Sequence, residues 1–184
     1  DETEQLVINR RWDFNGTHHG WSFYNGSAYS GLSMPGGAAS TYVQLHYEGD
    51  GRFRSPDNRN GEPINLPGKY NNIIRMKVKR NVNVASAVWQ GTIYWKGFDP
   101  IRKLKGDYLM LGEVQGRSVS ITEPLGTGDF GQDASGADIV GGIDADYVIL
   151  EWDMSAVLEW NECTIYQIRI DLVSGDAKFL IDWI

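Results

Sequence analysis

Apolar and polar residues alternate most regularly near the end of the chain. Residues 164–172 read TIYQIRIDL and residues 178–184 read KFLIDWI, and a period of two is typical of strands that bury one face. The polar residues at positions 174–176, with a glycine at their centre, predict a short turn between the two runs. We therefore expect a closing hairpin that ties the C-terminus into a sheet and completes the domain at Ile184.

Shorter runs with the same period occur earlier. The clearest are residues 72–80 and 88–96, which we expect to be neighbouring strands. Further strands are predicted at residues 6–8, 12–14, 42–47, 108–111, 118–121 and 148–154. Residues 48–68 are polar and contain three prolines, which predicts a surface loop. A bend or a single helical turn is expected at residues 155–161, and no amphipathic helix of ordinary length is expected anywhere.

This succession of short strands and glycine-rich turns indicates an all-β protein. A chain of 184 residues fits one antiparallel β-sandwich domain that spans residues 1–184. Residues 126–146 are rich in Gly and Asp without a core pattern, so we interpret residues 101–146 as a long insertion. The alternation predicts a core made of Trp12, Phe14, Trp21, Ile74, Met76, Val78, Ile93, Trp95, Leu150, Trp152, Ile168, Ile170, Phe179, Ile181 and Trp183.

Composition and charge limit the classes of partner. The hydrophobic fraction of 41% is enough for a sizeable core and argues against disorder. A net charge of −7 offers no electrostatic footprint for nucleic acid or for an anionic membrane, and no apolar run is long enough to span a bilayer. We therefore expect neither partner. The single cysteine, Cys163, excludes an internal disulfide, so stability must come from packing, with or without a metal.

Several segments resemble one family. Residues 12–21 read WDFNGTHHGW, which resembles the opening of galactose-binding-like jelly-roll modules. Residues 70–78 (YNNIIRMKV) and 90–95 (QGTIYW) resemble two of the family's central strands, and residues 147–153, 168–171 and 179–184 resemble later ones. Order and spacing match at both ends of the chain, whereas residues 101–146 are longer than the family pattern. The resemblance implies a jelly-roll sandwich in which the first and last strands are adjacent.

The resemblance also implies a function. Modules of this family occur beside bacterial polysaccharide-degrading enzymes and in some phage and surface proteins. We therefore expect a non-catalytic carbohydrate-binding module, extracellular or on a virion surface, whose partner is a polysaccharide or cell-surface glycan. The alternative is a structural, decoration or adhesion module of a phage particle or surface assembly, whose partners are other proteins.

A strip of polar side chains lies on the predicted solvent face of several strands. Aromatic faces stack on sugar rings, and charged or amide groups fix hydroxyls and carboxylates. We expect this strip to act as one ligand-binding surface, although a solvated face with cross-strand ion pairs would have the same pattern. The strip comprises Arg75, Lys77, Lys79, Tyr94, Lys96, Glu151, Gln167 and Arg169, with Trp89 as a further ligand-binding residue. Trp160, Tyr24 and Tyr29 are alternative stacking residues near loops.

A structural calcium ion is the second candidate. The resemblance implies one where the first and last strands meet, with Asp13 and Asp182 as ligands and Asp171 nearby. Hard oxygen ligands would be required. The same carboxylates could instead cap turns or pair with Arg10 and Arg11. A rival group of oxygen ligands lies in the predicted insertion, although its spacing fits no defined calcium loop: Asp129, Asp133, Asp138, Asp144 and Asp146.

Catalytic motifs are missing from the sequence. It contains no Gly-x-Ser-x-Gly, no His-Glu-x-x-His and no phosphate-binding loop, and Cys163 stands outside any motif. Paired carboxylates of a glycosidase would leave no signature of this kind, because their separation is set by the fold. We expect a protein that is not an enzyme.

Overall fold

The structure is a computed structural model, and it describes residues 10–26, 28–56, 64–82, 88–98, 109–114, 119–122 and 147–184. These ranges form the elements β1 (Ser22–Asn25), β2 (Leu32–Ser33), η1 (Gly37–Ala39), β3 (Val43–Arg54), β4 (Leu66–Pro67), η2 (Gly68–Tyr70), β5 (Ile73–Val82), β6 (Val88–Phe98), β7 (Leu109–Val114), β8 (Val119–Thr122), β9 (Val148–Asp153), α1 (Leu158–Asn161) and β10 (Thr164–Trp183). The predicted strand at residues 6–8 lies outside the described residues.

The predicted all-β class is confirmed. The strands of the described ranges pair antiparallel in one sheet, whose main path runs β1-β3-β10-β5-β9-β8. The remaining strands join at its sides: β2 pairs with β3, β4 and β6 pair with β10, and β7 pairs with β6. Within the described ranges the only α-helix is α1, a single turn inside the predicted bend. No helix in this part of the chain is long and apolar enough to cross a membrane.

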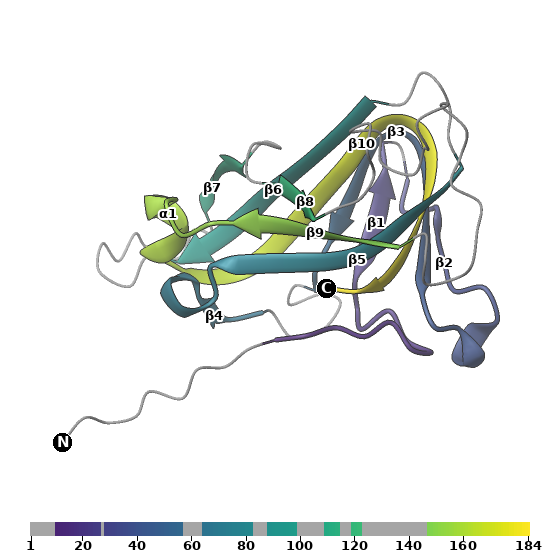
Figure 1. Ribbon diagram of the computed structural model, residues 1–184, viewed down its shortest axis with the longest axis horizontal. Coiled ribbons are helices and arrows are strands. Elements are labelled where there is room, and N and C mark those ends of the chain that lie inside the picture. The colour runs from purple at the N-terminus through teal and green to yellow at the C-terminus, as the bar shows by residue number, and fades with distance from the viewer. Residues whose placement is uncertain are drawn as a thin grey trace.

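The expected closing hairpin is wrong, because β10 is one continuous strand of 20 residues. The predicted turn at positions 174–176 pairs with β3 instead, with Ser174 opposite Asp50 and Gly175 opposite Gly49. Figure 1 shows β10 curving strongly on its way to the C-terminus. Glycine inside a strand is typical of such a bend, because it has no side chain to crowd the curved backbone. Residues that favour a turn locally are therefore held in a strand by their partner.

The predicted surface loop at residues 48–68 is also partly wrong. β3 continues through Glu48 to Arg54, and it is paired with β1 on one side and with β10 on the other. Its burial alternates, with Phe53 fully buried and Arg52 and Arg54 partly exposed. The run RFR at positions 52–54 therefore carries a strand pattern that the neighbouring glycines and prolines obscured.

The expectation that residues 72–80 and 88–96 are neighbours is wrong as well. β6 pairs with the first half of β10 and with β7, whereas β5 pairs with the second half of β10 and with β9. In Figure 1, β5 and β9 pass in front of β6 and of the first half of β10. The two halves of one bent strand thus hold β5 and β6 in different parts of the sheet. β7 and β8 lie inside the predicted insertion, and the rest of that insertion lies outside the described residues.

The two ends of the described chain meet, as expected. Trp12 donates its N–H to the carbonyl of Ile184 at 2.9 Å and accepts the N–H of Ile184 at 3.1 Å. Asp13 forms an antiparallel bridge with Trp183. The N-terminal segment therefore continues the sheet beside the last residues of β10.

The predicted core is buried with one exception. One apolar cluster receives side chains from the long strands β3, β5, β6 and β10, and it contains all the predicted core residues except Trp183. Trp183 is only partly buried, and Ile184 takes an inward position instead. The reason is a register shift between Ile181 and Trp183, which breaks the alternation of sides.

The close packing around Gly51 gives a test of the packing between β1 and β3. A Cβ atom added at Gly51 would lie 2.3 Å from Tyr47 Cδ1 and 2.5 Å from Phe23 Cζ, two buried rings packed edge to face. We expect Gly51→Ala to lower the free energy of unfolding by about 1–3 kcal/mol through overpacking. Gly49→Ala is the matched control, because an added Cβ meets nothing within 4 Å there. Urea unfolding measures both, and equal stabilities for the two variants would contradict this packing.

Candidate functional site

The structure divides the predicted polar strip into two groups, so the expectation of one continuous binding surface is wrong. Arg75, Lys77 and Lys79 lie on β5, with Glu151 opposite Arg75 on β9. Tyr94 and Lys96 lie on β6, and Gln167 and Arg169 lie beside them on the first half of β10. The cause is the bend in β10, which places β5 and β6 beside different halves of the same strand.

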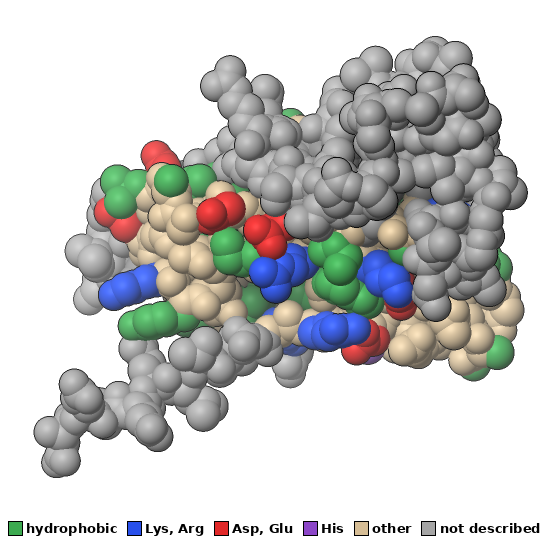
Figure 2. Space-filling view, in the orientation of Figure 1, with side chains coloured by type: hydrophobic (Ala, Val, Ile, Leu, Met, Phe, Trp, Pro, Cys, Tyr) green, Lys and Arg blue, Asp and Glu red, His purple; other side chains and the backbone are tan. Residues whose placement is uncertain are grey.

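The group on β5 and β9 consists largely of ion pairs. Arg75 Nε donates to Glu151 Oε2 at 2.7 Å, and Lys77 Nζ lies 3.0 Å from Asp182 Oδ2. Lys77 also lies over the ring of Tyr147, 5.2 Å from its centroid. Figure 2 shows basic and acidic side chains next to one another on this face. The group therefore has the character of a solvated sheet face with cross-strand pairs.

The group on β6 and β10 lines a pocket together with β3. Strand register places Arg54, Arg169 and Tyr94 in one row across β3, β10 and β6, with Lys96 opposite Gln167 in the next row. The pocket has a volume of about 140 Å³. We call it the Arg54 pocket; its lining residues are Arg52, Arg54, Tyr94, Trp95, Lys96, Gln167 and Arg169. Four of them are cations and none is a carboxylate.

Arg169 is held rigidly at the centre of this pocket. Its Nε donates to Asp171 Oδ1 at 2.8 Å, its Nη2 bonds the other carboxylate oxygen, and its guanidinium lies 4.3 Å from the ring centroid of Tyr94. Burial raises the pKa of Asp171, and Arg169 partly offsets this rise. Burial lowers the pKa of Arg169, but the bond and charge of Asp171 outweigh it and leave the pKa above its ordinary value. The ring of Tyr94 thus supports Arg169 on one face.

Gln167 has a structural role that its position in the alternation did not predict. Its side chain is buried, and its Nε2 donates to the carbonyl of Ser55 at 2.9 Å. Ser55 Oγ in turn accepts the N–H of Ile168 at 2.9 Å. These two bonds attach the end of β3 to β10. Gln167 therefore stabilises the strands that line the pocket, and its amide N–H is already bonded to the carbonyl of Ser55.

Arg54 and Lys96 differ from the other two cations of the pocket. Within the described residues neither has a carboxylate partner, whereas Arg52 pairs with Asp50 at 2.8 Å and Arg169 pairs with Asp171. Arg54 stands directly opposite Arg169, and like charges in this position destabilise a sheet. Arg52 and Arg54 were missed in the sequence because residues 48–68 were interpreted as a loop. The alternation at positions 52–54 was the signal that could have revealed them.

The aromatic candidates have different environments. Tyr29 is 67% exposed and packs edge to face with Tyr24, whose ring centroid lies 5.8 Å from the Arg52 guanidinium. Tyr24 therefore contacts a lining residue of the Arg54 pocket, and Tyr29 packs on Tyr24. Trp160 is buried, and its Nε1 donates to the carbonyl of Asn71 at 3.0 Å, so it belongs to the core. Trp89 lies on β6 opposite Val173, and its side chain lies outside the described part of the structure.

The described residues contain no group of oxygen ligands that fits the predicted calcium ion. Asp13 and Asp182 are close in the sheet, but Arg11 Nε donates to Asp13 Oδ1 at 2.8 Å and Asp182 pairs with Lys77. In the described ranges no three His, Cys, Asp or Glu side chains gather as a metal group would. These carboxylates therefore do not fit a calcium site on their own, and the ion stays a prediction. The five rival aspartates in the insertion lie outside the described residues.

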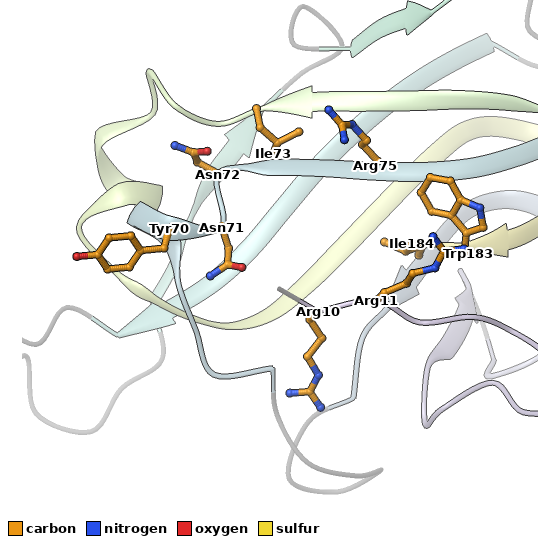
Figure 3. A pocket seen from close by; sticks show the side chains of 9 residues that line it. All are labelled: Arg10, Arg11, Tyr70, Asn71, Asn72, Ile73, Arg75, Trp183 and Ile184. Carbon is orange, nitrogen blue, oxygen red and sulfur yellow. The ribbon is translucent and has the colours of Figure 1, made fainter. Parts of the chain in front are cut away.

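A second and larger pocket lies at the edge of the sheet where the chain ends meet. It has a volume of about 420 Å³, and Figure 3 shows its lining side chains around the start of β5. Of the predicted ligand-binding residues whose side chains the structure describes, only Arg75 lines it. Its lining residues are Arg10, Arg11, Tyr70, Asn71, Asn72, Ile73, Arg75, Trp183 and Ile184.

Comparison of the chain with protein-family models, curated proteins and solved structures finds no match.

The supporting role of Gln167 can be tested against a neighbouring pocket residue. Gln167→Ala leaves the buried carbonyl of Ser55 without its donor, so we expect a loss of about 1–3 kcal/mol in the free energy of unfolding. Lys96→Ala, in the next position across the strands, is expected to change stability by no more than about 0.5 kcal/mol, because partly exposed side chains without partners contribute little. Thermal and urea unfolding measure both. An unchanged stability of Gln167→Ala would contradict the structural role.

Proposed function

We propose that this protein is a non-catalytic carbohydrate-binding module that binds an acidic polysaccharide or surface glycan in the Arg54 pocket. The observation that carries the proposal is the charge of the pocket: four cations line it, no carboxylate does, and two of the cations lack a described acidic partner. The chain as a whole has a net charge of −7, so this cluster runs against the overall charge. An anionic ligand would relieve the repulsion between Arg54 and Arg169.

The chemistry of the pocket suits a carboxylate or sulfate group on a sugar. A guanidinium can hold such a group with two parallel hydrogen bonds, and Lys96 adds a point charge. Arg52 also lines the pocket, and its guanidinium is paired with Asp50. The pocket volume of about 140 Å³ suits one charged group with part of its ring, and Tyr24 and Tyr29 offer apolar faces for the adjoining sugar.

The fold supports the same proposal. We propose that the bent sheet is a jelly-roll sandwich of galactose-binding-like type, in which β5 and β9 form one layer and β6 and the first half of β10 form the other. A single core between these strands and the adjacent chain ends support it. An extracellular or virion-surface location follows from this proposal. The lining of the Arg54 pocket holds no carboxylate, so the proposed glycan site includes no calcium ligand.

Removal of Arg54 should weaken glycan binding without harming the fold. We expect Arg54→Ala to lose about 1–3 kcal/mol of binding free energy for an acidic glycan, because a charge-assisted hydrogen bond disappears. Its free energy of unfolding should stay the same or rise slightly, because the like-charge contact with Arg169 is removed. A glycan array identifies the ligand, and isothermal titration calorimetry with the isolated glycan measures the loss.

Arg75→Ala is the matched control, since Arg75 is an exposed arginine on β5 that does not line the Arg54 pocket. Its affinity for the glycan should equal that of the unchanged protein. Normal binding by Arg54→Ala together with weak binding by Arg75→Ala would move the glycan site to β5. No glycan signal, together with a solution mass of a trimer or larger assembly, would favour the alternative of a structural or adhesion module.

A further inference from the structure

Another pocket lies beside β1, at the end of the sheet's main path. It has a volume of about 190 Å³. We call it the Tyr29 cleft; its lining residues are Trp21, Ser22, Phe23, Tyr29, Ser30 and Leu32. Trp21 and Phe23 are almost completely buried, whereas Tyr29 is 67% exposed. The cleft therefore reaches from the solvent to the edge of the core.

The chain forms this cleft where strand pairing is interrupted between β1 and β2. Both strands pair with β3, but Asn25, at the end of β1, donates its N–H to the carbonyl of Ala28 at 2.8 Å. Gly31 returns the chain to β3 with a φ of 92°, and a Cβ atom there would lie 2.6 Å from the carbonyl oxygen of His46. Glycine alone fits this position without strain. The interruption presents Tyr29 and Ser30 to the cleft.

The Tyr29 cleft adjoins the Arg54 pocket. Strand register places Ser22, which lines the cleft, directly opposite Arg54. Neighbouring strands lie about 4.8 Å apart, so a single strand spacing separates the two sites in this row. A second connection runs through side chains, because Tyr29 packs on Tyr24 with ring centroids 5.2 Å apart and Tyr24 contacts Arg52 of the pocket. Neighbouring units of one chain molecule can therefore occupy both sites.

The two sites differ in charge. Four cations line the Arg54 pocket, whereas the lining of the Tyr29 cleft contains aromatic rings, a leucine and two serines but no charged side chain. An anionic group in the cleft would lose water without gaining a cation, which is unfavourable. An uncharged sugar suits this lining, because its C–H surface packs on an aromatic ring while its hydroxyls bond with serine hydroxyls.

We propose that the Tyr29 cleft is a second subsite, which binds an uncharged sugar unit next to the acidic unit in the Arg54 pocket. This inference rests on the function proposed above. It narrows the ligand to acidic polysaccharides in which uncharged units stand beside charged ones. Tyr29 supplies the stacking ring, and Ser22 and Ser30 supply hydroxyls. A polysaccharide charged at every unit would place a carboxylate in the cleft.

A glycan array with the whole chain tests this narrowing of the ligand. One set of probes is unsulfated chondroitin and hyaluronan oligosaccharides, in which acidic and uncharged units alternate. The other set is galacturonate and alginate oligosaccharides, in which every unit carries a carboxylate. We expect stronger binding to the alternating set. In isothermal titration calorimetry, free glucuronic acid should bind more weakly than the alternating oligosaccharides, because it fills the Arg54 pocket alone.

Variants separate the cleft from the Arg54 pocket. Tyr29→Ala should lower the affinity for the alternating oligosaccharides roughly three- to tenfold, as expected for the loss of one aromatic contact, and should leave the affinity for glucuronic acid unchanged. Arg54→Ala should lower both affinities. Tyr70→Ala is the matched control and should change neither affinity, because Tyr70 is a partly exposed tyrosine that lines neither site.

The outcomes distinguish this inference from the proposed function. If the fully charged oligosaccharides bind best, or if Tyr29→Ala binds the alternating oligosaccharides normally while Arg54→Ala does not, the second subsite is overturned and the Arg54 pocket remains the glycan site. If no acidic glycan on the array binds, the proposed function is overturned and the second subsite with it.

Discussion

The bent pairing of β3 with β10 is the constraint on which the rest of this structure depends. β10 pairs with β3, β4, β5 and β6, so strands of different parts of the sheet share one central partner. At the bend Gly49 lies opposite Gly175, and glycine inside a strand is typical of such a bend. The apolar side chains of both halves of β10 belong to one core. Edge-to-face packing of Trp12 on Trp21, with ring centroids 5.4 Å apart, fixes the N-terminal segment on this core.

The cations on β5 and those in the Arg54 pocket differ in how fully carboxylates neutralise them. On β5, two cations have a carboxylate nearby, because Arg75 pairs with Glu151 and Lys77 with Asp182. At the Arg54 pocket the arrangement differs, because Arg54 and Arg169 are direct cross-strand neighbours and only Arg169 has a carboxylate partner among the described residues. Exposed pairs of the first kind contribute little to stability, whereas two neighbouring like charges of which only one has a carboxylate partner are unfavourable. The second arrangement is the one that a bound anion would stabilise.

The sequence by itself determined the class of fold and nearly all of the core. Period-two alternation depends only on which side of a strand is buried, so residues such as Met76, Ile93, Phe179 and Ile181 could be assigned to the core from their positions alone. Alternation failed at Trp183, where a register shift changes which side faces inward. Shifts of this kind depend on the partner strand, and the sequence around Trp183 therefore carried no local signal of it.

Only the tertiary structure decided which strands are neighbours, and therefore which polar residues share a site. The turn-like residues at positions 174–176 are kept extended by β3, and this one difference places Arg75 and Arg169 on separate surfaces. It also brings Arg54, from a segment expected to be a loop, into the same pocket as Tyr94. Local sequence records the preference of each residue for strand or turn, but the pairing of β3 with β10 joins segments that lie far apart in the chain. The physical reason is that backbone pairing and core burial outweigh local preference wherever the two disagree.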